Sequence, residues 1–470
     1  MAEISPKRSI TVPLLVLLNV SIMASLRNLP LVAGYGYSAL FFFIVVGTLF
    51  LVPSALVSAE LATGWPKSGG IYIWVREAFG NKWGFFAIWM QWAHNLTWYP
   101  AILSFVAATI AYIFNPGLAD QPLFVLAVVL ISYWAMTYLN YRGIKTSGLF
   151  SSIGVVAGTI LPGVFIILLA FYYLATGNPV QIQFNFESFV PDLSNIQNLV
   201  FLGGFFLAFA GLEVSAGYAG EVKEPQKNFP KAIIIAAIIV FFLFMLGSLS
   251  VAYVIPEKEI QLTTGLMEAF KTLLDYYHLG FILPITGGLL VLGAVAEVNA
   301  WIIGPVKALH MTSLHGNLPP YFQKLNEHGT PTRLLLYQAI IVSIVSLVFL
   351  FLPSISASYW ALTAVAAQMY LIMYLLMFIS AIRLRYVRPH VPRAYQIPHP
   401  HKGMWFVACV GIIGSLLGIF LTAIPPAQLA TGNVFVYESI IIIGVLVMAI
   451  IPFVIHKLKK PEWLILPDNE

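Results

Sequence analysis

The chain has 470 residues, of which 60% are hydrophobic and only 9% are charged, and its mean hydropathy is +0.88. A water-soluble protein needs roughly a quarter of its residues charged, so this composition excludes a soluble enzyme. About 12 membrane spans of roughly 20 residues each, with their loops, would use nearly the whole length. We therefore predict an all-α polytopic membrane protein with one transmembrane domain, 1–470.

Hydropathy predicts 12 transmembrane helices, of which the first and the sixth are interrupted by polar or glycine-rich residues. In chain order, the predicted spans are 9–35, 38–62, 83–113, 122–141, 148–176, 197–219, 230–255, 281–305, 334–352, 357–380, 404–424 and 437–456. The segment 259–277 alternates polar and apolar residues with helical spacing, which predicts a helix that lies along the outer membrane surface or caps an outer vestibule.

Basic residues are distributed unevenly over the predicted loops. With the N-terminus inside, all but three of the 24 Lys and Arg residues fall in cytoplasmic segments. Lys258 and Lys271 lie in outer loops, and Arg27 lies within the first span. Because positively charged loops stay in the cytoplasm, we predict that both termini are cytoplasmic. The net charge of +5 then follows from topology, and we predict no nucleic-acid partner.

The two interrupted spans lie five spans apart. The residues at the interruptions are Ser25, Leu26, Arg27 and Asn28 in the first span, and Ala208, Phe209, Ala210 and Gly211 in the sixth. Lipid cannot satisfy the backbone groups that such breaks free, so this backbone must line a cavity or be buried in protein. Close helix packing at small residues is the alternative for the sixth span. The pairing favours an inverted repeat of five plus five spans, with repeats 1–176 and 190–380 and two additional helices in 404–456.

The breaks also predict a kind of ligand. Half-helix N-termini offer unpaired amides to an anion, and C-terminal ends offer carbonyls to a cation. A zwitterionic amino acid fits both. We expect its carboxylate at the amides from Asn28 to Leu31 and its ammonium at the carbonyls of Ala208, Phe209 and Ala210.

Several short motifs surround these breaks. They are Ala59-Glu60-Leu61-Ala62 and Gly69-Gly70-Ile71-Tyr72 after the second span, Gly211-Leu212-Glu213, Glu224-Pro225 and Phe229-Pro230 around the sixth, and Ala296-Glu297, Trp301, Gly304-Pro305 and Leu318-Pro319 around the eighth. In these residues the chain resembles the amino acid, polyamine and organocation (APC) superfamily over essentially its whole length, and within it the bacterial glutamate/GABA antiporter family. The resemblance implies a LeuT-type fold and amino-acid transport by alternating access across a bacterial inner membrane, as an exchanger or proton-coupled symporter.

The resemblance also implies substrate-lining and gating roles. The residues concerned are Glu213, Glu297, Trp301, Tyr370 and Tyr374. Two features differ from the family's antiporter. That protein has an aromatic and an acidic residue in the first break, where this chain has Leu26, Arg27 and Asn28. The substrate of the family's antiporter therefore cannot simply be assigned to this chain. It also has a C-terminal segment that plugs the inner vestibule, whereas this chain has only 457–470 after its last span, and we expect no plug.

Three charged residues inside the spans need partners or a cavity. An ionised side chain at the bilayer centre costs about 2.5–3.5 kcal/mol on insertion scales. Glu213 and Glu297 could each form a static salt bridge with Arg27; alternatively, one of them carries a proton that couples transport to pH. Arg27 could be a fixed counter-ion in place of a metal cation, or it could bind a substrate carboxylate. His94, Asn95 and Trp98 form a polar patch that predicts interhelical hydrogen bonds.

We predict no metal ion, no cofactor and no enzyme activity. The single cysteine, Cys409, excludes a Cys-based metal site, and 289–305 in the eighth span contains no hydroxyl that could coordinate sodium. Motifs of hydrolases, metalloproteases and phosphate-binding loops are absent from the sequence.

The predicted partners are an amino acid, protons and membrane lipid, and the oligomeric state stays open. The amino acid is of the glutamate/GABA type by resemblance. The alternatives are a neutral amino-acid or polyamine permease, and a nutrient sensor that binds without transport; Arg27 opposes a polyamine. Glu60 is expected to anchor the inner end of the second span, and the basic run 383–402 to be a solvated loop or to contact anionic headgroups.

Overall fold

The computed structural model describes residues 10–66, 69–183, 186–215, 222–399, 401–427, 429 and 433–465. Over these residues the chain is helical, apart from turns, loops and two isolated β-bridges. Eleven helices are long and apolar enough to cross a membrane, and the bent pair Val12–Met23 and Leu26–Ala33 makes a twelfth span if it is counted as one. The prediction of an all-helical protein with 12 spans is confirmed.

The helices follow the predicted spans closely. In chain order they are α1 (Val12–Met23), α2 (Leu29–Ala33), α3 (Ser38–Val46), α4 (Val52–Gly64), α5 (Ile71–Phe79), α6 (Asn81–Phe114), α7 (Pro122–Tyr141), α8 (Ile144–Val155), α9 (Leu161–Ala175), α10 (Phe186–Phe189), α11 (Leu202–Ala208), α12 (Pro225–Val254), α13 (Gly265–Tyr276), α14 (Leu283–Leu314), α15 (Thr332–Ser346), α16 (Ile355–Val387), α17 (Lys402–Ala423) and α18 (Val434–Lys457). Three features were not predicted. Helix α5 lies between the second and third spans, and the short α10 lies between the fifth and sixth. Helix α14 continues through Pro305, since a single proline inside a packed membrane helix is tolerated.

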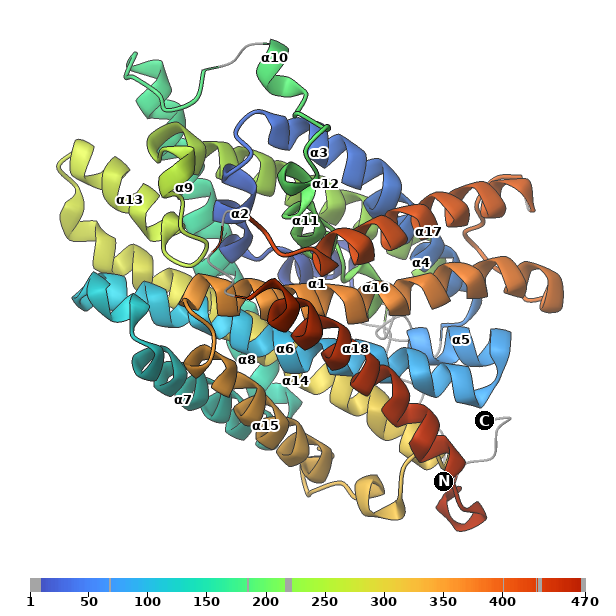
Figure 1. The fold of residues 1–470 in the computed structure, drawn as a ribbon. Helices are drawn as coiled ribbons and strands as arrows, with labels where there is room; N and C mark the ends of the chain where they lie inside the picture. Colours follow the sequence, from blue (N-terminus) through green and yellow to red (C-terminus); the bar gives the residue numbers. More distant parts are fainter. Residues whose placement is uncertain are drawn as a thin grey trace.

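Helix α6 lies at the centre of the bundle. Almost every residue from Gly84 to Thr109 is buried, as expected for a helix that is apolar on all sides. It packs along α14 and α16, and Figure 1 shows α6 and α16 side by side through the middle of the molecule. Residues of α6 that face these two helices are therefore placed at the heart of the protein.

Two glycines allow the fifth and eighth spans to touch. A π-helical turn, Val156–Ile160, joins α8 to α9. A Cβ atom at Gly158 would lie 2.1 Å from the backbone nitrogen of Gly293 in α14. Only glycine permits this approach, and it brings the fifth span close to Glu297, one turn further along α14.

The described ends of the chain lie at the end of the bundle opposite α13. Ile10 pairs with Val222, which precedes α12, and α12 then runs toward α13 (Figure 1). Helix α14 starts just after α13 and ends at Leu314, whose carbonyl accepts a hydrogen bond from the Ile465 amide at 2.9 Å. The two ends therefore lie on the same side.

Glu60 holds the end of the second span against α16. Its two carboxylate oxygens accept hydrogen bonds from Nε and Nη2 of Arg385, each at 2.6 Å, and one also accepts from the Ile397 amide at 2.9 Å. Nε of Arg393 lies 3.6 Å from the same carboxylate. All three charged side chains are buried. Glu60 is thus an anchor, as expected.

The two arginines of this cluster do not face solvent or lipid headgroups, contrary to the expectation for the run 383–402. Burial lowers the pKa of the Arg393 guanidinium, and the neighbouring Glu60 carboxylate opposes that effect without cancelling it. One carboxylate therefore compensates two buried cations.

We expect Glu60→Gln to destabilise the protein by about 3–5 kcal/mol, because removal of one member of a buried ion pair leaves the other charge uncompensated. Glu77→Gln is the matched control. Glu77 pairs with Arg388 at 3.3 Å, but the arginine is largely exposed, so its loss should change stability by less than about 1 kcal/mol. Thermal unfolding of the purified variants in detergent measures both effects, and equal melting temperatures for the two would contradict this account.

Candidate functional site

The first span breaks between α1 and α2. The two pieces are bent by 43° and joined by a single 3₁₀ turn, Leu26–Asn28. The amides of Asn28 and Leu29 donate within this turn, to Ser25 and Leu26. The amides of Ser25, Leu26 and Arg27 donate to no atom in the described part of the chain. The free amides therefore lie three residues earlier than the expected stretch from Asn28 to Leu31.

The sixth span breaks after α11. Gly211 has φ +117°, and a Cβ there would lie 2.9 Å from Ile22 in α1, so only glycine suits this position. The carbonyls of Ala208, Phe209 and Ala210 accept no hydrogen bond from any described residue. These are the carbonyls that the sequence predicts to be free. The glycines at 217 and 220 lie outside the described residues.

A small cavity of about 20 Å³ lies between the two breaks, and we call it the central cavity. Its lining contains eight of the predicted site residues: Ser25, Arg27, Asn28, Ala208, Ala210, Glu297, Trp301 and Tyr370. Leu26 lines an adjoining cavity of about 10 Å³, together with Thr159 of the fifth span. Phe209, Gly211, Glu213 and Tyr374 lie outside both linings. The breaks thus enclose one site from opposite sides.

Arg27 is buried without a carboxylate partner. It is 2% exposed, and neither carboxylate is joined to it by an ion pair among the described residues. Its Nη1 donates to the Tyr359 hydroxyl at 3.0 Å, and the guanidinium carbon lies 5.5 Å from the Trp98 ring centre and 5.6 Å from that of Tyr359. Its Nε has no hydrogen-bond partner among the residues that the structure describes. The aromatic rings stabilise the cation. The Nε–H of the guanidinium is left to donate to another group.

Glu297 faces the first break. It is 3% exposed, and its Oε2 accepts a hydrogen bond from the Ser25 hydroxyl at 2.8 Å. It lines both small cavities together with Arg27. The static salt bridge considered from the sequence is therefore not formed, and Glu297 stays available to a proton or a ligand in the cavity.

Glu213 is held by three uncharged donors. It is 1% exposed and accepts hydrogen bonds from the hydroxyls of Tyr370 and Tyr374 and, at 3.1 Å, from Gln91. The Tyr374 hydroxyl also accepts from the Gly211 amide at 2.8 Å. Tyr374 thereby connects the sixth-span break to α16.

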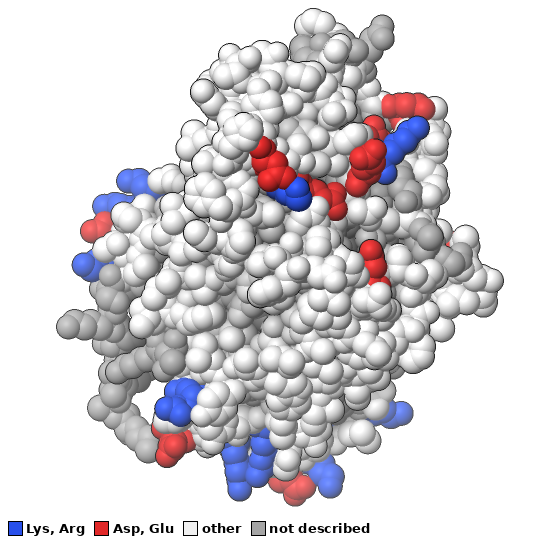
Figure 2. All heavy atoms as spheres, turned by 90° about the vertical axis from the view of Figure 1, so that its left-hand side faces the viewer, with Lys and Arg blue, Asp and Glu red and all other residues white. Residues whose placement is uncertain are grey.

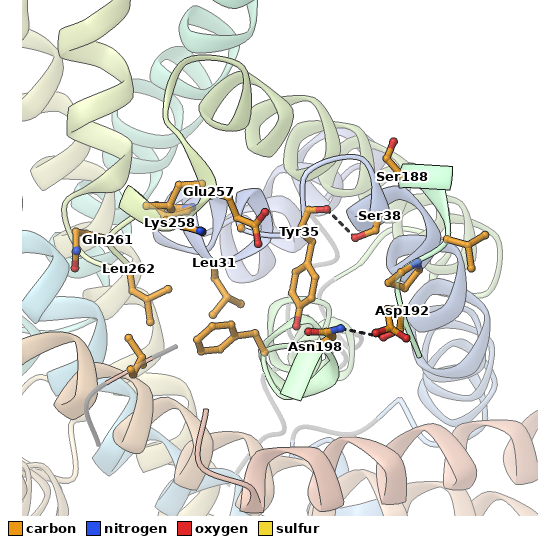
Figure 3. Close-up of a pocket in the computed structure, with 17 residues that line it drawn as sticks. Leu31, Tyr35, Ser38, Ser188, Asp192, Asn198, Glu257, Lys258, Gln261 and Leu262 are labelled. Carbon is orange, nitrogen blue, oxygen red and sulfur yellow. Dashed lines mark hydrogen bonds between the residues drawn. The ribbon is translucent and has the colours of Figure 1, made fainter. Parts of the chain in front are cut away.

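Two larger cavities approach the central cavity from opposite ends of the bundle. The first, which we call the Glu257 vestibule, has a volume of about 610 Å³ and lies between α2 and the segment before α13. Figure 3 shows Tyr35 pointing toward Asn198 within it, with Glu257 and Lys258 at one side and Asp192 at the other.

The second cavity, the Glu213 vestibule, has a volume of about 500 Å³ and is lined by Glu213, Gln91 and the last turns of α14. Neither vestibule shares a lining residue with the central cavity. The hydrogen bond from the Tyr370 hydroxyl to Glu213 connects the linings of these two cavities, because Tyr370 lines the central cavity and Glu213 lines the vestibule. Among the described residues, the central cavity is thus lined by a set separate from that of either vestibule.

The described C-terminal tail reaches the rim of the Glu213 vestibule. Leu464 pairs with His315 just after α14, and the carbonyl of Trp463 accepts from Gln323 at 2.7 Å. None of the tail residues up to Ile465 lines the cavity itself. This part of the tail therefore does not fill the vestibule.

Sequence reasoning missed the roles of His94 and Tyr359. The patch of His94 and Asn95 was expected to bond to other helices, but both side chains bond to the Gln91 carbonyl of their own helix. His94 lines the central cavity and stacks on Tyr370. The sequence does show a histidine within a long apolar stretch. Hydropathy alone does not indicate that this histidine lies near the two breaks.

Comparison with known proteins agrees with this geometry. Residues 11–447 match the model of a family described as amino acid permease. The chain belongs to the amino acid permease family. This membership implies the LeuT-type fold with its inverted repeat, and it makes the chain a multi-pass membrane transporter of the APC superfamily and not an enzyme.

Three relatives illustrate the range of this permease family. An uncharacterized transporter of Legionella pneumophila is 39% identical over 97% of this chain and 98% of its own. A glutamate/gamma-aminobutyrate antiporter of Lactococcus lactis is 32% identical over 94% of this chain and 89% of its own. A probable agmatine/putrescine antiporter of the same species is 23% identical over 84% of this chain and 83% of its own.

We expect Tyr374→Phe to open the central cavity toward the Glu213 vestibule, because it removes one hydroxyl that binds both Glu213 and the Gly211 amide. In a Cys409→Ser background, a cysteine replacing Ala210 should react several-fold faster with a water-soluble thiol reagent when Tyr374→Phe is added. A cysteine replacing Ala308, which lines the vestibule, is the control and should react quickly in both backgrounds. Unchanged reactivity at position 210 would contradict the proposal that the Tyr374 hydroxyl separates the central cavity from the vestibule.

Proposed function

We propose that this permease is a secondary active amino-acid transporter that works by alternating access, as an exchanger or as a proton-coupled symporter. One observation carries the proposal. Residues with free amides at the first-span break (Ser25, Arg27) and residues with free carbonyls at the sixth-span break (Ala208, Ala210) line a single small cavity, with a wider vestibule on either side. A carrier needs such a site, whereas a channel would need a continuous path.

The two breaks offer complementary partners for a zwitterion. The amides of Ser25, Leu26 and Arg27 would bind the substrate carboxylate, with the positive guanidinium of Arg27 close by. The carbonyls of Ala208, Phe209 and Ala210 would bind the ammonium. Asn28, Trp301 and Tyr370 would enclose the remainder of the substrate.

Glutamate or GABA is the substrate that we propose first. The Lactococcus lactis relatives at 32% identity are glutamate/gamma-aminobutyrate antiporters by name. Arg27 Nε has no partner, so the guanidinium could also receive a side-chain carboxylate. A neutral amino acid remains the alternative. A diamine is disfavoured, because an unpaired buried guanidinium repels it.

Glu297 is the proposed proton carrier. An ionised Glu297 would repel a substrate carboxylate bound at the neighbouring amides, because its Oε2 lies 2.8 Å from the Ser25 hydroxyl. Binding of the substrate therefore favours the protonated form. Glu213 would act as a gate, since it joins the wall of the central cavity to the vestibule on the other side.

We further propose that the Glu213 vestibule opens to the cytoplasm of a bacterial cell, with the protein in the inner membrane and both termini inside. Figure 2 views the opposite end of the bundle, where acidic side chains gather over the upper half and basic ones along the lower edge. Lys258 and Lys271 are the lysines near α13. This distribution supports a cytoplasmic Glu213 side under the positive-inside rule. The two repeats would be 1–176 and 190–380, with 404–456 as the appended pair.

The experiment that tests the function is counterflow in proteoliposomes. Liposomes preloaded with unlabelled glutamate should accumulate labelled glutamate transiently, and the twenty amino acids, GABA and putrescine should be screened as competitors. We expect glutamate and GABA to compete, putrescine not to compete, and a sodium gradient to have no effect. A protein that binds an amino acid without any counterflow would be a sensor, and this would contradict the transporter proposal.

We expect Glu297→Gln to retain counterflow and to lose the pH dependence of net uptake, because a glutamine mimics the protonated acid permanently. Initial uptake rates of the wild type and the variant across acidic to neutral pH measure this. Glu77→Gln, a surface substitution, should keep the wild-type profile. A Glu297→Gln protein with the wild-type pH profile would remove Glu297 from proton coupling.

A further inference from the structure

His94 is a buried histidine with one unused nitrogen at the central cavity. It belongs to α6, is 2% exposed, and lines the same cavity as Ala208 and Ala210 of the sixth-span break. None of the roles proposed above uses it.

The hydrogen bonds of His94 fix which nitrogen carries the proton. Nδ1 lies 2.5 Å from the carbonyl oxygen of Gln91, one turn earlier in α6. A carbonyl can only accept, so Nδ1 must carry the hydrogen, and in the neutral ring Nε2 then holds a lone pair. Nε2 has no hydrogen-bond partner in the described part of the chain, and it is not one of the fully enclosed polar atoms that lack one. It therefore borders an open space, and the cavity that His94 lines is the central one.

Neighbouring rings hold the imidazole in place. It stacks on Tyr370 with ring centres 4.0 Å apart and planes 4° from parallel, and it meets Trp301 edge-on at 5.6 Å. Tyr370 is itself held by its hydrogen bond to Glu213. The lone pair of Nε2 is thus presented to the cavity in a fixed direction.

The charged groups around this nitrogen are of both signs. On the α16 side, the hydroxyl of Tyr370 leads to the Glu213 carboxylate, which also binds the Gln91 side chain of α6. Arg27 and Glu297 line the same cavity from the first and eighth spans. The same lining contains Ala208 and Ala210 of the sixth-span break, whose carbonyls accept no hydrogen bond from any described residue. A neutral imidazole nitrogen and backbone carbonyls share one property, since both accept hydrogen bonds.

We propose that Nε2 of His94 accepts a hydrogen bond from the substrate's ammonium group and so completes the ammonium subsite begun by the carbonyls of Ala208, Phe209 and Ala210. This inference rests on the proposed function and assigns one further residue to its binding site. His94 therefore favours ligands with an N–H donor at that pole over the same ligand without its amine.

The test measures binding of two matched probes, L-glutamate and its amine-less analogue glutarate, to the purified wild type, His94→Phe and His94→Gln. Phenylalanine keeps a ring that can stack on Tyr370 and removes the acceptor, whereas the glutamine side-chain oxygen can still accept. A hydrogen bond to a charged group predicts that His94→Phe weakens glutamate binding by about 10- to 100-fold. Glutarate binding should change by less than about twofold, and His94→Gln should recover part of the loss.

His310→Phe is the matched control, since it replaces another buried histidine, whose Nε2 is engaged with the Gln323 carbonyl at 2.9 Å. It should leave the ratio of glutamate to glutarate affinity unchanged. If His94→Phe does not fold, His94→Met replaces it, because methionine also fills the space without a nitrogen acceptor. Equal effects of His94→Phe on both probes, or no effect on either, would overturn the inference.

A different experimental result would contradict the proposed function itself. A wild type that shows no saturable binding of glutamate, GABA or any of the twenty amino acids would overturn both the function and this inference. A wild type that binds glutamate and a His94→Phe variant with the same preference for glutamate over glutarate would overturn the inference alone.

Discussion

The backbone of a membrane-spanning helix must satisfy its own hydrogen bonds, because lipid offers none. In this chain the backbone hydrogen bonds of the spanning helices are interrupted at two places. Ser25, Leu26 and Arg27 leave three amides free, and Ala208, Phe209 and Ala210 leave three carbonyls free among the described residues. Four of these residues, Ser25, Arg27, Ala208 and Ala210, line one small cavity of the bundle.

The buried charges divide into two kinds. Glu60 has Arg385 and Arg393 as fixed ionic partners, and this cluster joins the second span to α16 permanently. Near the breaks, in contrast, Arg27 is held by aromatic rings and a tyrosine hydroxyl, Glu297 by a serine hydroxyl, and Glu213 by tyrosine and glutamine donors. Uncharged partners can hold a charge in place without neutralising it. The charges near the cavity thus remain available to a substrate or a proton.

Much of the fold could be predicted, because a long apolar stretch in a membrane has few alternatives to a helix. The two breaks were also predictable, since Pro30 has no amide hydrogen and Gly211 readily adopts a positive φ, and both residues stand at the breaks. Hydropathy could not predict which residues have free amides. The 3₁₀ turn at Leu26–Asn28 forms hydrogen bonds with two of the amides that were expected to be free. Hydropathy also could not place His94 at the cavity, since this depends on how α6 is rotated against α14 and α16.

The central claim is that the carboxylate and the ammonium of one amino acid bind the two breaks. An experimental structure with L-glutamate bound in the occluded state tests this claim most directly. The account predicts the α-carboxylate within hydrogen-bond distance of the Ser25, Leu26 and Arg27 amides, and the ammonium at the carbonyls of Ala208 to Ala210. Glutamate bound only in a vestibule, or in the central cavity with its two charged groups exchanged, would contradict it.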